Sequence, residues 1–417
     1  MAADRTVRRR VLVLTGIFPN RCNPTWGVHV FQNVRALAAH ADVRVVAAVP
    51  WVPRRLARGR YRVYAGVPAR DRWEGIETVY PRFVVVPRVG RFLHGYQLFA
   101  SILPAVAEEV RRFRPDALLA YFAYPYGFAA VLFGGVFRLP VAVSCRGSDV
   151  NFMTAPRLQG GLIRRALKAC GHVLVMSEDM RALVLGWGVE PAHVTVVSNG
   201  VDAVRFAPAD RGAARASLGL ALDARIAVCV SRLSHEKGID VLIDAARVIG
   251  HPDVRIVVVG DGVERDALTA QAHAAGLAER ITFAGTRPHD EIPRWLAAAD
   301  VAVLPSRAEG MPNAVLEALA AGRPVVATAV GGTRELIHDP ALGLLVPPDD
   351  PASLAKALEQ ALSSPWDAAL IARSVSSRTW DAVGERTARC VDAAMLTGAG
   401  RNAHTPSEHT PWHAGTR

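Results

Sequence analysis

The feature that most constrains this chain is an alternation of strand-like and helix-like segments that loosens midway and then starts again. Short β-branched runs alternate with segments of helical spacing, and this order favours parallel β-α-β units. The alternation loosens over Val201–Leu220, which contains Pro208, Asp210 and Gly212. The 417 residues also exceed the roughly 250–300 at which a single core stops growing. We therefore expect an α/β protein of two doubly wound, Rossmann-like domains, one after the other.

The pattern places the elements as follows. In the first half we expect strands at Arg10–Thr15, Val43–Ala48, Ala117–Tyr121, Val141–Ser144 and His172–Met176, and helices at Val28–Ala39, near Leu98–Phe113, from Gly127, at Leu162–Cys170 and at Glu178–Gly186. In the second half we expect strands at Ile226–Val230, Arg255–Val259, Ile281–Ala284, Val301–Leu304 and Val325–Ala327, and helices at Gly238–Ile249, Val263–Ala275, His289–Ala298 and Asn313–Ala321. The expected domains are 1–200 and 201–375, followed by a C-terminal helix over 376–396 that packs back on the first domain. Residues 397–417 have no apolar period and are expected to be a disordered tail.

One strand-to-helix junction of the second half carries two carboxylates. The segment Ser306–Glu317 follows an expected strand and enters an expected helix, with Pro312 suited to the first helical turn. Such a junction directs backbone N–H groups and the positive end of a helix dipole toward the edge of the sheet, which suits a diphosphate. Glu309 lies just before the helix and Glu317 within it, so both can accept hydrogen bonds from sugar hydroxyls. Two glutamates at this spacing alone would be as consistent with surface charge.

The wider segment is more specific. Pro305–Gly332, with the sequence PSRAEGMPNAVLEALAAGRPVVATAVGG, closely resembles the donor-site signature of retaining glycosyltransferase family 4, whose members have an E-x7-E pattern and the GT-B fold. The resemblance implies that Glu309 contacts the transferred sugar and Glu317 the ribose hydroxyls. It also implies that the backbone from Gly310 through Met311 and Pro312 to Asn313 contacts the sugar and phosphates.

A second segment supports the resemblance. Val230–Gly238, with the sequence VSRLSHEKG, is similar to the G-R-L-x-x-x-K-G segment of the family, with Ser231 in the usual place of a glycine. Arg232 and Lys237 would face the two phosphates, with a bidentate fork and a point charge respectively. No cluster of metal ligands is visible to neutralise the leaving nucleotide, so we expect neither a metal nor another cofactor. Glu309, Arg232 and Lys237 are the expected catalytic residues.

The first domain is expected to bind the acceptor. The segment from Gly16 to Val30 resembles the glycine loop of the family, in which Gly27 would let the backbone approach the donor phosphate. Trp26 and His29 would face the acceptor, although His29 could equally be an ordinary histidine at the start of a helix. Arg146 and Asp149 belong to an R-G-S-D turn that resembles the family's cleft-facing turn; Asp149 would touch the acceptor or organise the loop.

The clearest departure from the family lies at 117–127, where relatives often have H-A-H-F-x-Y-P-D-G. Here Tyr121 stands in the place of the second histidine, which lies beside the transferred sugar, and Tyr126 in the place of the aspartate. A tyrosine is a poor base near neutral pH. Retaining transfer need not use an enzyme base if the leaving phosphate takes the acceptor proton, so activity is compatible with this change. Reduced activity or an unusual acceptor is the expected consequence.

The charge of the chain is uneven. The net charge is +11, and residues 1–200 contain 27 Arg and Lys against 12 Asp and Glu, a balance of +15. This surface suits an anionic acceptor or peripheral contact with an acidic membrane face, although a solvated arginine-rich surface explains it equally well. The charge is diffuse and no recognition motif is present, so a nucleic-acid partner is not expected. No apolar stretch of about 18 residues is present, the N-terminus lacks a signal peptide's apolar region, and the five cysteines are scattered, so we expect a cytoplasmic protein.

The leading hypothesis is a hexosyltransferase that uses a UDP- or GDP-sugar and retains the anomeric configuration. Its acceptor would be a carbohydrate or lipid-linked molecule, such as a precursor of cell-envelope polysaccharide. A nucleotide-sugar epimerase can share the same architecture. A non-catalytic nucleotide-sugar-binding protein is the third possibility, supported only by Tyr121. The E-x7-E pattern matches the transferases more closely than either alternative.

Overall fold

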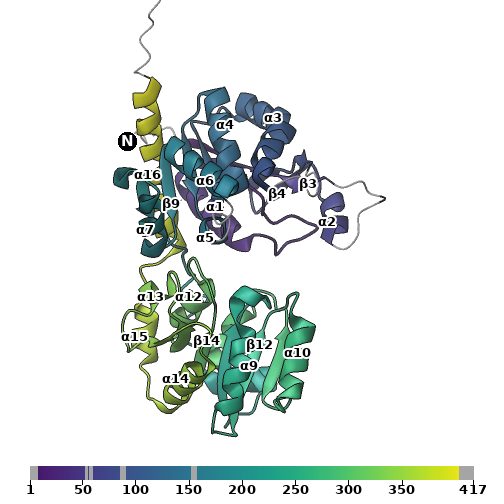
Figure 1. Ribbon diagram of the computed structural model, residues 1–417, viewed down its shortest axis with the longest axis vertical. Coiled ribbons are helices and arrows are strands. Elements are labelled where there is room, and N and C mark those ends of the chain that lie inside the picture. Colours follow the sequence, from purple (N-terminus) through teal and green to yellow (C-terminus); the bar gives the residue numbers. More distant parts are fainter. Residues whose placement is uncertain (1–7, 52–54, 56–59, 85–90, 152–156, 403–417) are drawn as a thin grey trace, which may run out of the picture.

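The computed structural model describes residues 8–51, 55, 60–84, 91–151 and 157–402. Two α/β domains follow one another along the long axis of the molecule, and the chain crosses between them twice (Figure 1). The first crossing leaves the first domain at about Gly200, and the second returns to it at Trp380. The two crossings lie side by side, since the Val201 amide donates to the Arg378 carbonyl at 2.8 Å. The expected two-domain GT-B architecture is confirmed.

The first domain contains an eight-stranded sheet in the order β10-β9-β8-β7-β1-β2-β5-β4. Its strands are β1 (Arg10–Thr15), β2 (Asp42–Ala47), β4 (Arg70–Trp73), β5 (Ile76–Val79), β7 (Ala117–Tyr121), β8 (Val141–Ser144), β9 (His172–Val175) and β10 (Val194–Val196). Only the edge strand β4 is antiparallel to its neighbour. A separate pair is formed by β3 (Val49–Pro50) and β6 (Arg82–Phe83).

Helices cover both faces of this sheet. They are α1 (Val28–His40), α2 (Arg60–Gly66), α3 (His94–Phe113), α4 (Phe128–Phe137), α5 (Ser148–Asn151), α6 (Arg157–Ala169) and α7 (Glu178–Gly186). Because side chains alternate along a strand, Val11 and Val13 of β1 pack on the α1 side, whereas Leu12 and Leu14 pack on the side of α3 and α4. The sheet is thus buried on both faces, as its continuous β-branched runs predict.

The second domain contains six parallel strands in the order β13-β12-β11-β14-β15-β16. They are β11 (Arg225–Val230), β12 (Val254–Val259), β13 (Ile281–Gly285), β14 (Val301–Leu304), β15 (Val325–Thr328) and β16 (Gly343–Val346). The helices are α8 (Arg211–Leu218), α9 (Ile239–Val248), α10 (Arg265–Ala274), α11 (Ile292–Ala298), α12 (Asn313–Ala320), α13 (Thr333–Leu336), α14 (Pro351–Ser363) and α15 (Ala368–Arg373).

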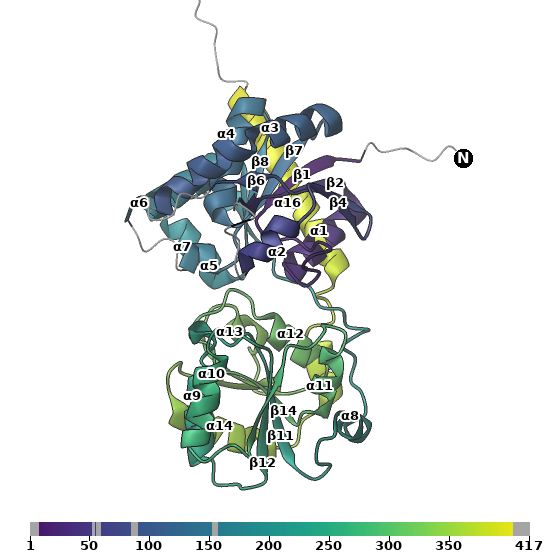
Figure 2. The same cartoon turned by 90° about the vertical axis from the view of Figure 1, so that its right-hand side faces the viewer.

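Each sheet has a topological switch point, where successive crossovers change direction. In the second domain it lies between β11 and β14, which are neighbours although β12 and β13 separate them in sequence. In the first domain it lies between β1 and β7. Ligands of open α/β sheets bind beyond the carboxyl ends of the strands at such points. The loops after these strands meet at the boundary between the two domains (Figure 2).

The C-terminal helix α16 (Trp380–Asn402) returns to the first domain and packs along α1 (Figure 2). The helices approach closely, because a Cβ added to Gly384 would lie 2.2 Å from the Ala36 carbonyl oxygen. The helix continues six residues beyond Leu396, so the expected disordered tail is wrong for residues 397–402, where regular helical hydrogen bonding continues past the packed stretch. The rest of the expected tail, 403–417, lies outside the described residues. No helix in the described ranges is long and apolar enough to cross a bilayer.

A buried histidine in the first domain predicts an acid-sensitive stability. His172, at the start of β9, is 3% exposed, its Nε2 lies 2.8 Å from Thr195 Oγ1, and burial, followed by nearby His193, lowers its pKa to about 4. Since an unfolded histidine titrates near 6.5, the unfolded chain binds a proton first as the pH falls, and stability is lost between pH 6.5 and 4. When the pH falls from 7 to 5, we expect the unfolding free energy of the wild type to drop by about 2 kcal/mol more than that of His172→Gln. Urea unfolding at the two pH values measures this difference. An equal loss in both proteins would contradict this assignment.

Candidate functional site

The centre of the candidate site is an ion pair between the loops that follow β11 and β14. Lys237 Nζ lies 2.7 Å from Glu309 Oε1, and Ser306 Oγ donates a hydrogen bond of 2.7 Å to the same oxygen. The Glu309 side chain is only 8% exposed. The two loops meet because β11 and β14 are adjacent at the switch point. The structure therefore brings together two of the three residues expected to be catalytic.

Two glycines allow the backbone to approach closely enough to form this pair. Gly238 has φ +63°, and a Cβ there would lie 2.1 Å from the Pro305 carbonyl oxygen. Gly331 has φ +49°, and a Cβ there would lie 2.1 Å from the Glu309 carbonyl oxygen. Both positions therefore require a residue without a side chain. The glycines at the end of the two matched segments hold Lys237 and Glu309 in place.

Arg307 also links the loop after β14 to the loop after β11. Its backbone amide donates to the Glu236 carbonyl at 2.9 Å, and its guanidinium donates to the His235 carbonyl at 2.6 Å. The same guanidinium forms a fork with Asp240, at 2.9 and 2.6 Å. The bond to Asp240 is the largest cause of a raised pKa of Arg307. Arg307 is thus a positioning residue on the far side of the Lys237–Glu309 pair.

The third residue expected to be catalytic is placed differently. Arg232 is exposed and pairs with Glu236 at 3.0 Å, four residues along its own loop, rather than with Glu309. In the next loop, Met311 is buried and packs against Gly332, where an added Cβ would lie 2.8 Å from the Met311 methyl carbon. Gly310 lies between Glu309 and this anchor, and Pro312 is the residue before the first turn of α12. The loop that the sequence assigns to the donor is therefore held firmly at both ends.

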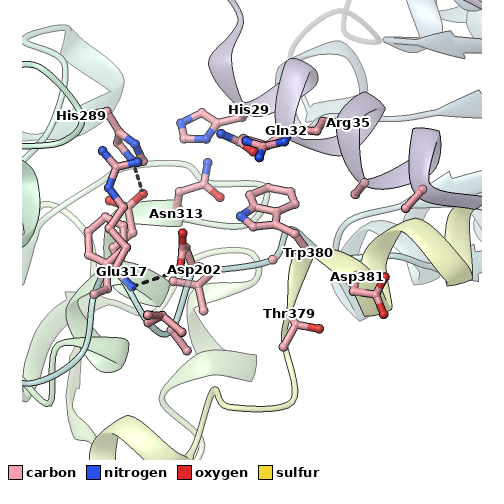
Figure 3. Close-up of a pocket in the computed structure, with 18 residues that line it drawn as sticks. His29, Gln32, Arg35, Asp202, His289, Asn313, Glu317, Thr379, Trp380 and Asp381 are labelled. Carbon is pink, nitrogen blue, oxygen red and sulfur yellow. Dashed lines mark hydrogen bonds and ion pairs between the residues drawn. The ribbon is translucent and has the colours of Figure 1, made fainter. Parts of the chain in front are cut away.

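The second glutamate lies at an interdomain cavity of about 450 Å³. Glu317 Oε1 is 2.9 Å from His289 Nε2, and Figure 3 shows both on the second-domain side of the cavity, opposite His29, Gln32 and Arg35 of α1. His29 and His289 approach edge to face with ring centroids 6.4 Å apart. Loss of water contact through burial is the largest cause that lowers the pKa of His29, to about 4. This histidine, open to the cavity, is therefore uncharged at neutral pH.

An asparagine of the first interdomain crossing connects the domains. Asn199 is 1% exposed, and its amide nitrogen donates to Asn313 Oδ1, at the start of α12, at 2.6 Å. Its oxygen accepts from Asn33 of α1 at 3.1 Å and from the Arg146 guanidinium at 2.7 Å. One amide thus joins both domains behind the donor loop.

Because of these hydrogen bonds, we expect the substitution of Asn199 to lower the stability of the protein. Asn199→Ala removes three hydrogen bonds and leaves buried partners unpaired, so we expect about 2 kcal/mol lower unfolding free energy, measured by denaturant unfolding. Asn199→Asp, which has the same shape but lacks the donor to Asn313, should retain the bond from Arg146 and lose less. A loss below 0.5 kcal/mol for Asn199→Ala, the usual limit for surface positions, would show that the network contributes little.

The residues expected at the acceptor side are distributed over several surroundings. Gly27 has φ +74° and precedes α1, and a Cβ there would lie 2.7 Å from the Ile17 carbonyl carbon. Trp26 stacks on Tyr64, with ring centroids 5.0 Å apart. Tyr126 is buried, and its hydroxyl lies against Gly16, where an added Cβ would be 2.2 Å away. Burial is the largest cause that raises the pKa of Tyr126 well above its ordinary value, so this hydroxyl is no base.

In the R-G-S-D turn, the arginine and the aspartate make different contacts. Asp149 is fully buried, and its two oxygens accept from the backbone amides of Ala123 at 2.5 Å and Arg146 at 2.9 Å, so it organises two loops. Burial raises the pKa of Asp149. The Arg146 guanidinium lies 5.6 Å above the centroid of the Tyr121 ring. Tyr121 is 1% exposed, and burial raises its pKa to about 12.

Several residues of the site were not predicted. Ser306 and Arg307 lie inside a matched segment, so their proximity to Glu309 in sequence was an available signal. Asn199 belongs to an N-G-V-D turn that resembles the family, but its three partners come from distant segments. His289 precedes α11 with no pattern that marks it. The described residues contain no group of three or more His, Cys, Asp or Glu side chains that could hold a metal ion.

Both domains of the chain match sequence models of known families. The sequence model of Glycosyltransferase Family 4 matches residues 27–205, and that of Glycosyl transferases group 1 matches residues 210–374. The chain is 30% identical over 359 residues to TuaC of Bacillus subtilis, whose name assigns it to teichuronic acid biosynthesis; the match covers 84% of this chain and 88% of that protein. It is 38% identical over 217 residues to a D-inositol 3-phosphate glycosyltransferase of Mycolicibacterium gilvum, which covers 51% of this chain and 47% of that protein.

Solved structures support the fold. The structure of Anabaena HepE in complex with UDP has a TM-score of 0.69 at 21% identity and covers 92% of this chain and all of the other. WaaG, a glycosyltransferase involved in lipopolysaccharide biosynthesis, has a TM-score of 0.63 at 17% identity and covers 95% and 99% of the two chains. The long match to TuaC and the two family models, which together cover most of both domains, lead to one conclusion. The chain belongs to glycosyltransferase family 4, a family of sugar-transferring enzymes, and has the GT-B fold.

Proposed function

We propose that this enzyme transfers a hexose-type sugar from a UDP- or GDP-sugar to a carbohydrate or lipid-linked acceptor, with retention of the anomeric configuration. The observation that carries the proposal is the Lys237–Glu309 pair at the switch point, with Glu317 further along the same helix-loop segment. HepE has been solved in complex with UDP-glucose, and TuaC is named for teichuronic acid biosynthesis. These likenesses favour a nucleotide-sugar donor and an envelope precursor as acceptor.

In the proposed reaction, the bond from the anomeric carbon to the diphosphate oxygen breaks, and a bond to the acceptor oxygen forms on the same face. Lys237 stabilises the negative charge that develops on the leaving diphosphate. Glu309 orients the sugar, and Glu317 the ribose. Tyr121 cannot take the acceptor proton at neutral pH, because burial raises its pKa to about 12. The proton therefore passes to an oxygen of the leaving diphosphate, and no metal ion or other cofactor takes part.

The same proposal includes a cytoplasmic location and peripheral contact with an acidic membrane face through the basic first domain. The net charge of +15 in residues 1–200 supports such contact. A lipid-linked acceptor would be presented at that face. Binding to vesicles that contain acidic lipid, lost at high salt, would test this part.

The test of the reaction is an assay of donor turnover with purified protein. We expect release of nucleoside diphosphate from one member of a panel of UDP- and GDP-sugars, stimulated by an extract of envelope precursors, with the α-anomeric proton of the product seen by NMR. Isomerised nucleotide sugar without an acceptor would identify an epimerase instead. Tight donor binding without product over the whole panel would identify a non-catalytic binding protein. Inversion at the anomeric carbon would refute the retaining mechanism.

A further inference from the structure

Among the described charged groups of the cleft, Arg146 is an enclosed cation that forms no direct ion pair with a carboxylate. Lys237 pairs with Glu309, Arg232 with Glu236, and His289 lies against Glu317. Arg146 forms no ion pair with a described acid. The acid nearest in sequence, Asp149, uses its oxygens to accept from two backbone amides. Asp149 therefore acts on the guanidinium through space, where its charge favours the charged form, and no described carboxylate contacts the guanidinium directly.

The partners that Arg146 does have are neutral. One guanidinium nitrogen donates to Asn199 Oδ1 at 2.7 Å, and the face of the Tyr121 ring lies 5.6 Å away. A guanidinium carries five N–H donors, and burial lowers the pKa of Arg146. Removing a charge from water is costly unless an opposite charge offsets the loss. A bound anion in direct contact with the guanidinium would add to the through-space effect of Asp149.

The place of Arg146 indicates which substrate would carry the anion. Arg146 follows β8 of the first domain, and its backbone meets the donor loop, since a Cβ added to Gly310 would lie 3.1 Å from the Arg146 carbonyl oxygen. The Arg146 turn therefore lies, from the opposite domain, against the loop that would hold the transferred sugar. Beside it, at the end of the neighbouring strand β7, the Tyr121 hydroxyl is buried and has no hydrogen-bond partner in the described structure. A protonated phenol can donate to an anion.

We propose that Arg146, assisted by the hydroxyl of Tyr121, binds a phosphate or carboxylate carried by the acceptor close to its reacting hydroxyl. The proposal rests on the proposed transfer reaction and adds the chemical class of the acceptor. The donor diphosphate has its own cation, Lys237, and its own helix N-terminus, α12, both in the second domain. The positive balance of residues 1–200 would draw an anionic acceptor toward the first domain.

The test compares charged and neutral sugars as probes. The full-length protein, saturated with UDP or GDP, is titrated calorimetrically with glucose 6-phosphate, glucuronate and glucose. We expect at least one charged sugar to bind tenfold or more tightly than glucose. Arg146→Met should remove this preference without changing the affinity for glucose, and Arg146→Lys should restore part of it. Arg165→Met, at an exposed site of α6 in the same domain, is the matched control and should behave as the wild type.

The outcomes separate the alternatives. A preference for glucose 6-phosphate assigns a phosphate, and a preference for glucuronate assigns a carboxylate. Equal binding of all three sugars to the wild type, or an undiminished preference in Arg146→Met, would overturn the proposal. So would a tenfold weaker affinity of Arg146→Met for UDP or GDP with unchanged sugar binding, which would make Arg146 a donor contact. If neither nucleotide binds, the transfer reaction fails, and the same titrations without nucleotide still decide whether Arg146 binds an anion.

Discussion

Replacing Lys237 with alanine is expected to lower kcat/KM for sugar transfer by about 100-fold or more, a loss of about 2.7 kcal/mol of transition-state stabilisation. The substitution removes the cation closest to Glu309, whose carboxylate is 2.7 Å away and nearly enclosed. Glu309 would then keep its bond from Ser306 but lose its ion pair with Lys237, and the leaving diphosphate would lose the point charge of Lys237. Steady-state rates of nucleoside diphosphate release with the preferred donor measure the effect.

The effect can be separated from a general loss of structure. Lys356→Ala, on the exposed face of α14, is the matched control and should retain full activity. If Lys237 served only to neutralise Glu309, the double variant Lys237→Ala, Glu309→Gln would be as active as Glu309→Gln alone. If Lys237 stabilises the leaving group, the double variant is slower than Glu309→Gln alone. Unchanged transfer in Lys237→Ala would show that the site assignment is wrong.

Most of the fold follows from the sequence because the strands of both sheets, apart from the edge strand β4, are parallel, and the sheets are buried on both faces. Such strands are continuous apolar runs, and the helices between them have a clear period, so β7, β8 and β14 begin and end at the expected residues. The elements that were missed lack this pattern. Three of the four residues of the edge strand β4 (RDRW) are charged. The strand β16 (GLLV), at an edge of the second sheet, begins with a glycine and is only partly buried.

The candidate site also has residues that the sequence predicts and contacts that it does not. Glu309 and Lys237 are predictable, because each lies in a long matched segment at the carboxyl end of a strand. The distance between them is not predictable from either segment, since it depends on β11 and β14 being neighbours across the switch point. Asn199 shows the limit more clearly, because its three partners are 166, 53 and 114 residues away. A single sequence contains no signal for contacts of that kind.

Gly331→Ala is expected to lower the unfolding free energy by about 3 kcal/mol and to reduce transfer by about 100-fold. A residue with a side chain at φ +49° is strained by about 1–2 kcal/mol, and its Cβ would lie 2.1 Å from the Glu309 carbonyl oxygen, a position that backbone cannot share without moving. The overlap adds about 1–3 kcal/mol, as in other overpacked sites. Because Glu309 belongs to the displaced segment, its carboxylate would leave Lys237 and Ser306.

Gly219→Ala provides the matched control that separates strain from displacement. Gly219 has φ +67°, close to that of Gly331, but nothing lies within 4 Å of an added Cβ. It should therefore lose only about 1–2 kcal/mol and retain transfer at the wild-type rate. Urea unfolding gives the stabilities, and rates at 25 °C, where both variants are folded, give the activities. Equal activity in the two variants would mean that the close approach of Gly331 does not position Glu309. A selective loss in Gly331→Ala would show that the glycine pair ending the donor segment acts by holding the catalytic carboxylate in place.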